Sequence, residues 1–179
     1  MGDPKRTKKK FDTPRHPWVK EVIDTEKELV RQYGLKNKKE VWKFKSKLRN
    51  FKAQSKEYSH DLTGDERDKQ ELLLQKLRRF GILNESQGLD DVLGLDVKDI
   101  LERRLQTILY RKNMANSIKQ ARQFIVHNHV LVNGKKINVP GYLVKVDEES
   151  TIEFANGSAL AREEHPEIAH LANKNKVEE

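Results

Sequence analysis

The hydrophobic residues of this chain follow two different periods. From residue 18 to about residue 126, apolar side chains recur every three or four positions, which predicts a series of amphipathic helices. After residue 129 apolar and polar residues alternate over short runs, as is typical of half-buried strands. The pattern therefore predicts an α+β fold that is mainly helical in its N-terminal part.

Residues 18–96 are predicted to form a helical lobe. A helical pattern over residues 18–33 ends at Gly34, a residue type that suits a helix C-terminus. The next helix should begin after Asn37, which is an expected N-cap. Basic residues cover most of this second helix, and its apolar side is formed by Val41, Phe44, Leu48 and Phe51.

A third helix of this lobe is predicted to end at Gly81. Thr63 and Glu66 form the capping-box pattern that opens it. The adjacent Asp90 and Asp91 could be a catalytic carboxylate pair. They precede apolar residues, however, and we interpret them as the start of a short helix.

Residues 97–154 are predicted to form a small module of two helices followed by an antiparallel sheet. Apolar residues from Val97 to Leu109 share one face of a first helix that Asp96 should cap. Ser117, with Gln120 three residues later, should cap the second.

The strands of this module should follow directly. The segment 130–132 leads into Asn133-Gly134, the dipeptide that most strongly indicates a two-residue hairpin turn. The stretches LVKV (143–146) and TIEF (151–154) are predicted to supply further short strands.

Both ends of the chain lack apolar periodicity. Residues 1–17 contain three prolines and six basic residues, so we expect an extended basic arm that buries too little apolar surface to fold alone. Residues 155–179 are acidic and are predicted to be a loosely structured tail.

The charge distribution points to a polyanionic partner. The chain has 36 Lys and Arg against 28 Asp and Glu, a formal net charge of +8. Residues 103–146 contain nine basic residues and no acidic one. Because a solvated surface usually mixes both signs, we interpret this block as a surface for nucleic acid or an anionic membrane.

The composition bears on the cellular location of the protein. No apolar run approaches the roughly 18 residues that cross a bilayer, and no apolar segment follows the basic N-terminus as in a signal peptide. There is no cysteine, hence no disulfide or thiolate metal site. We expect a cytoplasmic protein.

Two histidines, His127 and His129, raise the question of metal binding or catalysis. Zinc takes three or four protein ligands, yet no carboxylate lies between Glu102 and Asp147. No nucleophile elbow and no phosphate-binding glycine motif is present. We therefore predict no metal, no cofactor, no small-molecule substrate and no enzymatic activity. For His129 the alternative to a functional role is a satisfied ring at the entry to the first strand.

The helix that begins at Ile118 is amphipathic. Ile118 and Ile125 lie on its apolar face, and Arg122 lies at the border, where its stem can pack while its guanidinium reaches outward. The opposite face carries hydrogen-bond donors, namely Lys119, Gln120, Gln123 and His127. An ordinary solvated helix face remains the alternative to a polyanion-binding one.

The stretch SIKQARQFIVHNHVLVNGKKINVPGYLVK resembles the small RNA-binding domain named after small-subunit ribosomal protein four. The upstream stretch LDDVLGLDVKDILERRLQTILYRKNMANS resembles that ribosomal protein family itself, in its archaeal and eukaryotic branch. The arm KRTKKKFDTPRHPW and the segment LLLQKLRRFGIL are similar to the same branch. Two positions depart from the family: Asn128 replaces a common glycine, and Gly141 a frequent serine.

The resemblance and the charge pattern together define the expected RNA-binding residues. The resemblance implies Arg104, Arg111, Lys112, Ser117, Lys119, Gln120, Arg122, Gln123, His127, Lys135 and Lys136. The basic arm and the other basic segments add Lys5, Arg6, Lys8, Lys9, Lys10, Lys45, Lys47, Arg49, Lys52 and Arg103.

The resemblance implies a structural component of the small ribosomal subunit that binds 16S-type ribosomal RNA early in assembly. It also implies a place near the path of incoming messenger RNA, a contribution to translational accuracy, and neighbouring small-subunit proteins as partners. The alternative is a heat-shock-type or other non-ribosomal RNA-binding factor with the same module. RNA-modifying enzymes attach the module to a large catalytic domain, and a membrane-surface protein should expose larger apolar helix faces.

Overall fold

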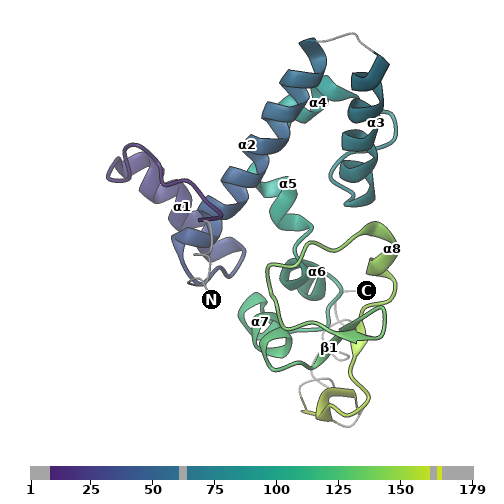
Figure 1. The fold of residues 1–179 in the computed structure, drawn as a ribbon. Helices are drawn as coiled ribbons and strands as arrows, with labels where there is room; N and C mark the ends of the chain where they lie inside the picture. Colours follow the sequence, from purple (N-terminus) through teal and green to yellow (C-terminus); the bar gives the residue numbers. More distant parts are fainter. Residues whose placement is uncertain (1–8, 61–63, 162–164, 167–179) are drawn as a thin grey trace, which may run out of the picture.

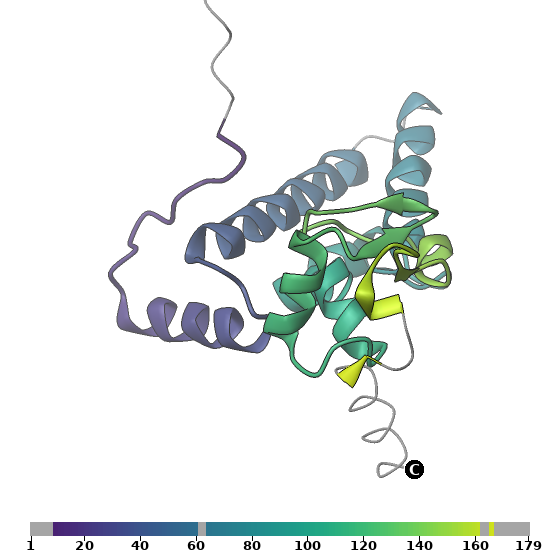
Figure 2. The same ribbon diagram turned by 90° about the horizontal axis from the view of Figure 1, so that it is seen from below.

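The computed structural model describes residues 9–60, 64–161 and 165–166 and confirms the α+β fold. The helices of the first half are α1 (Lys20–Gln32), α2 (Lys38–His60), α3 (Gly64–Arg79) and α4 (Leu89–Gly94). Both views place α1 near the N-terminal end of α2 and α3 near its C-terminal end (Figure 1; Figure 2). The long helix α2 is thus the central helix of the helical lobe, with α1 and α3 near its opposite ends.

The second half contains short helices and one small sheet. Its elements are α5 (Val97–Glu102), α6 (Leu105–Arg111), α7 (Ile118–Val126), β1 (Val130–Val132), β2 (Lys135–Lys136), α8 (Val146–Glu149), β3 (Glu153–Phe154) and the 3-10 turn η1 (Ala159–Ala161). In Figure 1, α5 lies between α2 and the group formed by α6, α7 and the sheet.

Local capping signals predicted the helix ends well. The Asn37 side chain accepts a hydrogen bond from the Glu40 backbone N–H at 3.2 Å, and Asp91 accepts one from the Gly88 N–H at 2.8 Å. Gly34 ends the first helical segment with a left-handed φ of 56°. The Thr63 prediction lies outside the described residues, as does the side chain of Glu66.

Among the described residues, the hydrophobic core consists of two clusters. The predicted apolar side of α2 is buried and packs against α3 residues such as Leu77 in the first cluster. The second cluster joins α6, α7 and the sheet through residues such as Leu109, Ile125 and Val130. Ile100 and Leu101 of α5 belong to the first cluster, so the change from one core to the other falls between Leu101 and Leu105.

The predicted single helix over residues 97–109 is wrong, because the chain turns between α5 and α6. Arg104 has an extended conformation (φ −74°, ψ 136°) and forms an antiparallel bridge with Leu143. The Leu105 N–H donates to the Tyr142 carbonyl at 2.8 Å. Long-range backbone hydrogen bonds thus replace helical ones at this point, which apolar spacing cannot reveal.

The sheet has the order β2-β1-β3 with antiparallel pairing. Asn133 and Gly134 have φ values of 50° and 71°, so both residues have the positive φ that a type I′ hairpin requires, as predicted. The predicted LVKV strand is wrong. Val146 begins α8 instead, since the Lys145 N–H is satisfied locally by the Glu148 carboxylate at 3.2 Å.

The segment that follows β3 packs back on the module. Ala155, Ser158 and Leu160 are buried, and the Ser158 hydroxyl lies 2.8 Å from Nδ1 of His129. The expectation of a loosely structured tail is therefore wrong for residues 155–161. In the part of the chain that the structure describes, no helix combines the length and apolar character needed to span a bilayer.

Candidate nucleic-acid interface

A groove of about 560 Å³ lies where α2 meets the module. It combines residues of the arm, of α2 and α7, the residue before α6, and the loop 139–141. Its lining contains one carboxylate, Glu40, and five basic side chains: Lys10, Lys43, Lys47, Arg104 and Arg122. We call this site the junction groove. The excess of positive charge makes it suited to a polyanion.

The α2 wall of the groove follows from helical spacing. Lys43 and Lys47 are four residues apart and Asn50 follows three residues later, so all three lie on one helix face. Lys43 is exposed and Lys47 half-buried. Burial, and then the charge of Lys76, lowers the pKa of Lys47. Neither Lys43 nor Lys47 forms an ion pair with a described residue, although the ammonium of Lys47 lies over the Phe80 ring, 5.8 Å from its centroid. No carboxylate of the described residues therefore neutralises either charge.

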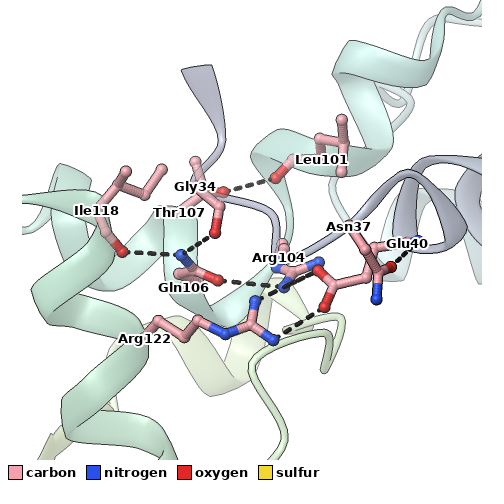
Figure 3. A network of polar contacts seen from close by, with 9 residues as sticks. All are labelled: Gly34, Asn37, Glu40, Leu101, Arg104, Gln106, Thr107, Ile118 and Arg122. Atoms are coloured by element: carbon pink, nitrogen blue, oxygen red, sulfur yellow. Dashed lines mark hydrogen bonds and ion pairs between the residues drawn. The ribbon is translucent and has the colours of Figure 1, made fainter. Parts of the chain in front are cut away.

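The floor of the groove is a network around Glu40 (Figure 3). Arg104 Nη2 donates to Oε2 of Glu40 at 2.8 Å. Arg122 donates from Nη2 to Oε1 at 2.9 Å and from Nη1 to Oε2 at 3.3 Å. Burial alone would raise the pKa of the Glu40 carboxyl, but the hydrogen bonds and charges of both arginines outweigh it and hold that pKa below its ordinary value.

Gln106 extends this network across the two halves of the molecule (Figure 3). Its Nε2 donates to the Gly34 carbonyl at 3.1 Å and to the Ile118 carbonyl at 2.8 Å. Its Oε1 accepts from Arg104 at 3.1 Å. The same amide thus joins the loop after α1, the start of α7 and the floor of the groove.

A second contact across the junction involves Tyr33. Its hydroxyl donates to Glu102 at 2.9 Å, and Glu102 also pairs with Arg111 at 3.1 Å. Burial and the hydrogen bond to Glu102 raise the pKa of Tyr33 to about 12. The tyrosine therefore stays protonated, as a hydrogen-bond donor, through the neutral range.

The structure does not place every predicted RNA-binding cation on the surface. The Arg104 side chain is only 2% exposed, so we remove it from the set of direct contacts. Arg103 pairs with Glu149 at 2.9 Å and is largely covered. The segment 103–146 contains no acidic residue, but in the folded protein carboxylates from outside the segment pair with its arginines.

The outer face of α7 keeps its donors exposed. Lys119, Gln123 and His127 are exposed, and Ser117 caps the helix as predicted, accepting from the Gln120 N–H at 3.2 Å. The Gln120 side chain accepts from the Asn116 N–H at 2.7 Å. Beyond α7, Lys135 and Lys136 of β2 are exposed at the hairpin.

Other predicted residues have intramolecular partners. Lys45 pairs at 2.9 Å with Glu26, whose side chain is buried; Arg49 pairs with Asp12; and Lys112 donates to the Glu149 carbonyl. Lys9 lies over the Phe11 ring, 4.9 Å from its centroid. Lys52 is half-buried, and the predictions for Lys5, Arg6 and Lys8 lie outside the described residues.

Lys43 was missed at the sequence level, although its spacing from Lys47 was visible. The resemblance singled out position 141 only as a departure from the family, and the place of residues 139–141 in the groove could not be predicted, because it depends on how the module packs against α2. Among the described residues, no group of three or more His, Cys, Asp or Glu side chains could hold a metal ion.

Comparison with known proteins defines the class first: residues 103–150 match the S4 domain, an RNA-binding module. The wider chain is 51% identical over 168 residues to small ribosomal subunit protein uS4 of Methanococcus maripaludis strain C5, covering 93% of this chain and 94% of the relative. It is also 51% identical to uS4 of Methanococcus aeolicus and 47% identical to that of Methanococcus vannielii, each over 93% of this chain and 95% and 94% of the relative. The chain belongs to the uS4 family of small ribosomal subunit proteins.

Proposed function

We propose that this protein binds 16S-type ribosomal RNA directly, as a structural and non-catalytic component of the small ribosomal subunit. The junction groove carries the proposal, because arm, α2 and α7 bring cations together there with a single carboxylate. Phosphate neutralisation by Lys and Arg dominates affinity for nucleic acid.

The proposed contacts include the groove and the exposed basic and polar groups of α7 and the hairpin. We assign Lys10, Lys43, Lys47 and Arg122 to phosphates in the groove. The exposed donors of α7 and the hairpin then extend the surface, namely Lys119, Gln123, His127, Lys135 and Lys136. Such a surface suits folded RNA, which proteins recognise largely by shape and backbone.

The link between the two halves supports a role in assembly. Gln106 and Glu40 connect the helical lobe to the module through hydrogen bonds. A protein whose two halves are held in one arrangement would fix the RNA segments bound to each half in a defined relation. On this basis we propose that it nucleates the subunit body early in assembly.

The finer placement follows the family. We propose a position near the path by which messenger RNA reaches the subunit, contact with neighbouring small-subunit proteins, and a contribution to translational accuracy. The proposed location is the small ribosomal subunit in the cytoplasm. Co-sedimentation after a high-salt wash tests this, because an integral component stays with the particle and a heat-shock-type factor leaves it.

Direct RNA binding is tested with the double variant Lys43→Ala/Lys47→Ala and a transcript of 16S-type ribosomal RNA. Filter binding across salt concentrations should give weaker affinity and a log–log salt slope reduced by about two, one for each phosphate that is no longer neutralised. The matched control is Lys56→Ala/Lys69→Ala, which removes two exposed lysines outside the groove. Equal slopes for both double variants would contradict RNA binding in the groove.

A further inference from the structure

Glu40 is an unexpected residue in a phosphate-binding groove. It is the one carboxylate among the residues that line the junction groove, and a negative charge there repels a polyanion. Simple electrostatics therefore predicts that removing it would strengthen RNA binding. The geometry of the network leads to the opposite expectation.

We infer that Glu40 is a positioning residue for RNA binding, which holds Arg122 toward the groove and compensates the buried charge of Arg104. This inference rests on the proposed function, since it concerns the same groove. Glu40 acts through the arginines and does not itself touch RNA.

The first step is the fork between Glu40 and Arg122. Both oxygens of Glu40 accept from the two terminal nitrogens of Arg122, at 2.9 and 3.3 Å. A two-point contact fixes the plane of a guanidinium, whereas a single contact leaves it free to rotate. These bonds use two of the five N–H groups that a guanidinium carries. The Arg122 side chain remains 23% exposed, so the held guanidinium can still meet a phosphate.

The second step is charge compensation beneath the groove. Arg104 and Arg122 share Oε2 of Glu40, so the two guanidiniums are close neighbours. Burial, and the nearby charge of Arg122, lowers the pKa of Arg104, while Glu40 acts in the opposite direction. Without Glu40 the two cations would repel each other with no carboxylate between them, and Arg122, the less buried of the two, would move away.

The third step is the placement of Glu40 on the backbone. Glu40 lies in the first turn of α2, where its backbone N–H donates a hydrogen bond to the Asn37 side chain. The same helix carries Lys43 and Lys47 into the groove. Because Glu40 lies on α2 and binds Arg122, it fixes the distance between this cation of α7 and the two lysines of α2. A preformed binding site for successive phosphates requires such a fixed distance.

The test compares Glu40→Gln with the matched control Glu57→Gln, which removes an exposed acid from the same helix outside the groove. The probe is the 16S-type ribosomal RNA transcript. We expect Glu40→Gln to bind about tenfold more weakly, the effect of losing hydrogen bonds to a charged group. The salt slope should fall by about one because Arg122 no longer neutralises a phosphate. Glu57→Gln should bind as tightly as the parent or slightly more tightly.

Two further measurements separate positioning from loss of structure. A merely structural defect lowers the fraction of active protein, seen by stoichiometric titration, but leaves the salt slope unchanged. In an Arg122→Ala background, Glu40→Gln should cost less affinity than it does alone, because both changes remove the same interaction. If Glu40→Gln does not fold, Arg122→Lys decides: it keeps the charge but cannot form the fork, so it should bind several-fold more weakly with the parent slope.

The outcomes distinguish this inference from the proposed function. If Glu40→Gln binds as tightly as the parent with an unchanged slope, or if Arg122→Lys matches the parent, the positioning role is overturned. The groove still binds RNA in that case, provided that Lys43→Ala/Lys47→Ala binds weakly. If the lysine variant also binds normally, the proposed function of the groove itself fails.

Discussion

In the part of the chain that the structure describes, two carboxylates each pair with two cations: one lies inside the helical lobe and the other where α2 meets the module. Glu26 of α1 pairs with Lys38 at 3.7 Å and Lys45 at 2.9 Å, both on the next helix. Glu40 pairs with Arg104 and Arg122, which follow it by 64 and 82 residues. The ion pairs of Glu26 join two neighbouring helices, whereas the ion pairs of Glu40 join distant parts of the fold.

The partners of the two carboxylates differ in solvation. Lys38 and Lys45 keep 38% and 40% of their side chains exposed, so water can solvate them if Glu26 is removed. Arg104 is 2% exposed, and its Nε has no hydrogen-bond partner among the described residues. Removing a charged partner should therefore lower the stability far more in the Glu40 network than in the Glu26 network.

The largest expected effect is that of Arg104→Ala. It removes the hydrogen bonds that Glu40 Oε2 and Gln106 Oε1 accept from Arg104. It also removes a buried side chain that fills the space between α2 and the module, so we expect a loss of about 3–5 kcal/mol in the free energy of unfolding. Chemical denaturation with circular dichroism measures it. A loss below about 1 kcal/mol would show that the junction is not held by this pair.

A pH titration of stability should separate Glu40 from the other acids. Its folded pKa is lowered from the ordinary 4.5, so its stabilisation is fully present above pH 4.5 and is lost as the pH falls through the folded pKa. The difference in unfolding free energy between the parent and Glu40→Gln should be constant from neutral pH to about pH 5 and shrink below 4.5. A constant difference down to pH 2 would contradict the ion pair.

Glu26→Gln should have a smaller effect, near 1 kcal/mol, because its lysines are partly exposed. The Trp42 indole N–H, which donates to Glu26 at 3.0 Å, can still donate to the amide oxygen. Thermal melts of Glu26→Gln beside Glu40→Gln make the comparison direct. If Glu26→Gln lowered the melting temperature more than Glu40→Gln, the expected order of the two carboxylates would be reversed.

The smallest expected effect on stability is that of Lys119→Ala. This lysine is exposed on α7 and forms no ion pair with a described residue, so the melting temperature should stay within measurement error. RNA affinity should fall, with a salt slope reduced by about one. Lys45→Ala is the matched contrast, since its charge is engaged by Glu26, and it should change the slope less.

Local signals determined most of the secondary structure. Asn37 and Ser117 act as caps, the apolar side of α2 is buried, and Asn133-Gly134 forms the predicted turn. These features depend on residues within one or two helical turns, and so they can be inferred from a single chain. The break between α5 and α6 could not be, because hydrogen bonds to residues 142–144 impose it.

The candidate site divides in the same way. By itself the sequence determined that residues 103–146 hold nine cations and no acid, and that the outer face of α7 is polar. Only the tertiary structure decided which cations remain available, because Glu40 folds back onto Arg104 and Arg122 while Lys43 joins the groove from α2. Ion pairing depends on distances of a few ångströms between segments far apart in the chain, and no periodicity within either segment encodes those distances.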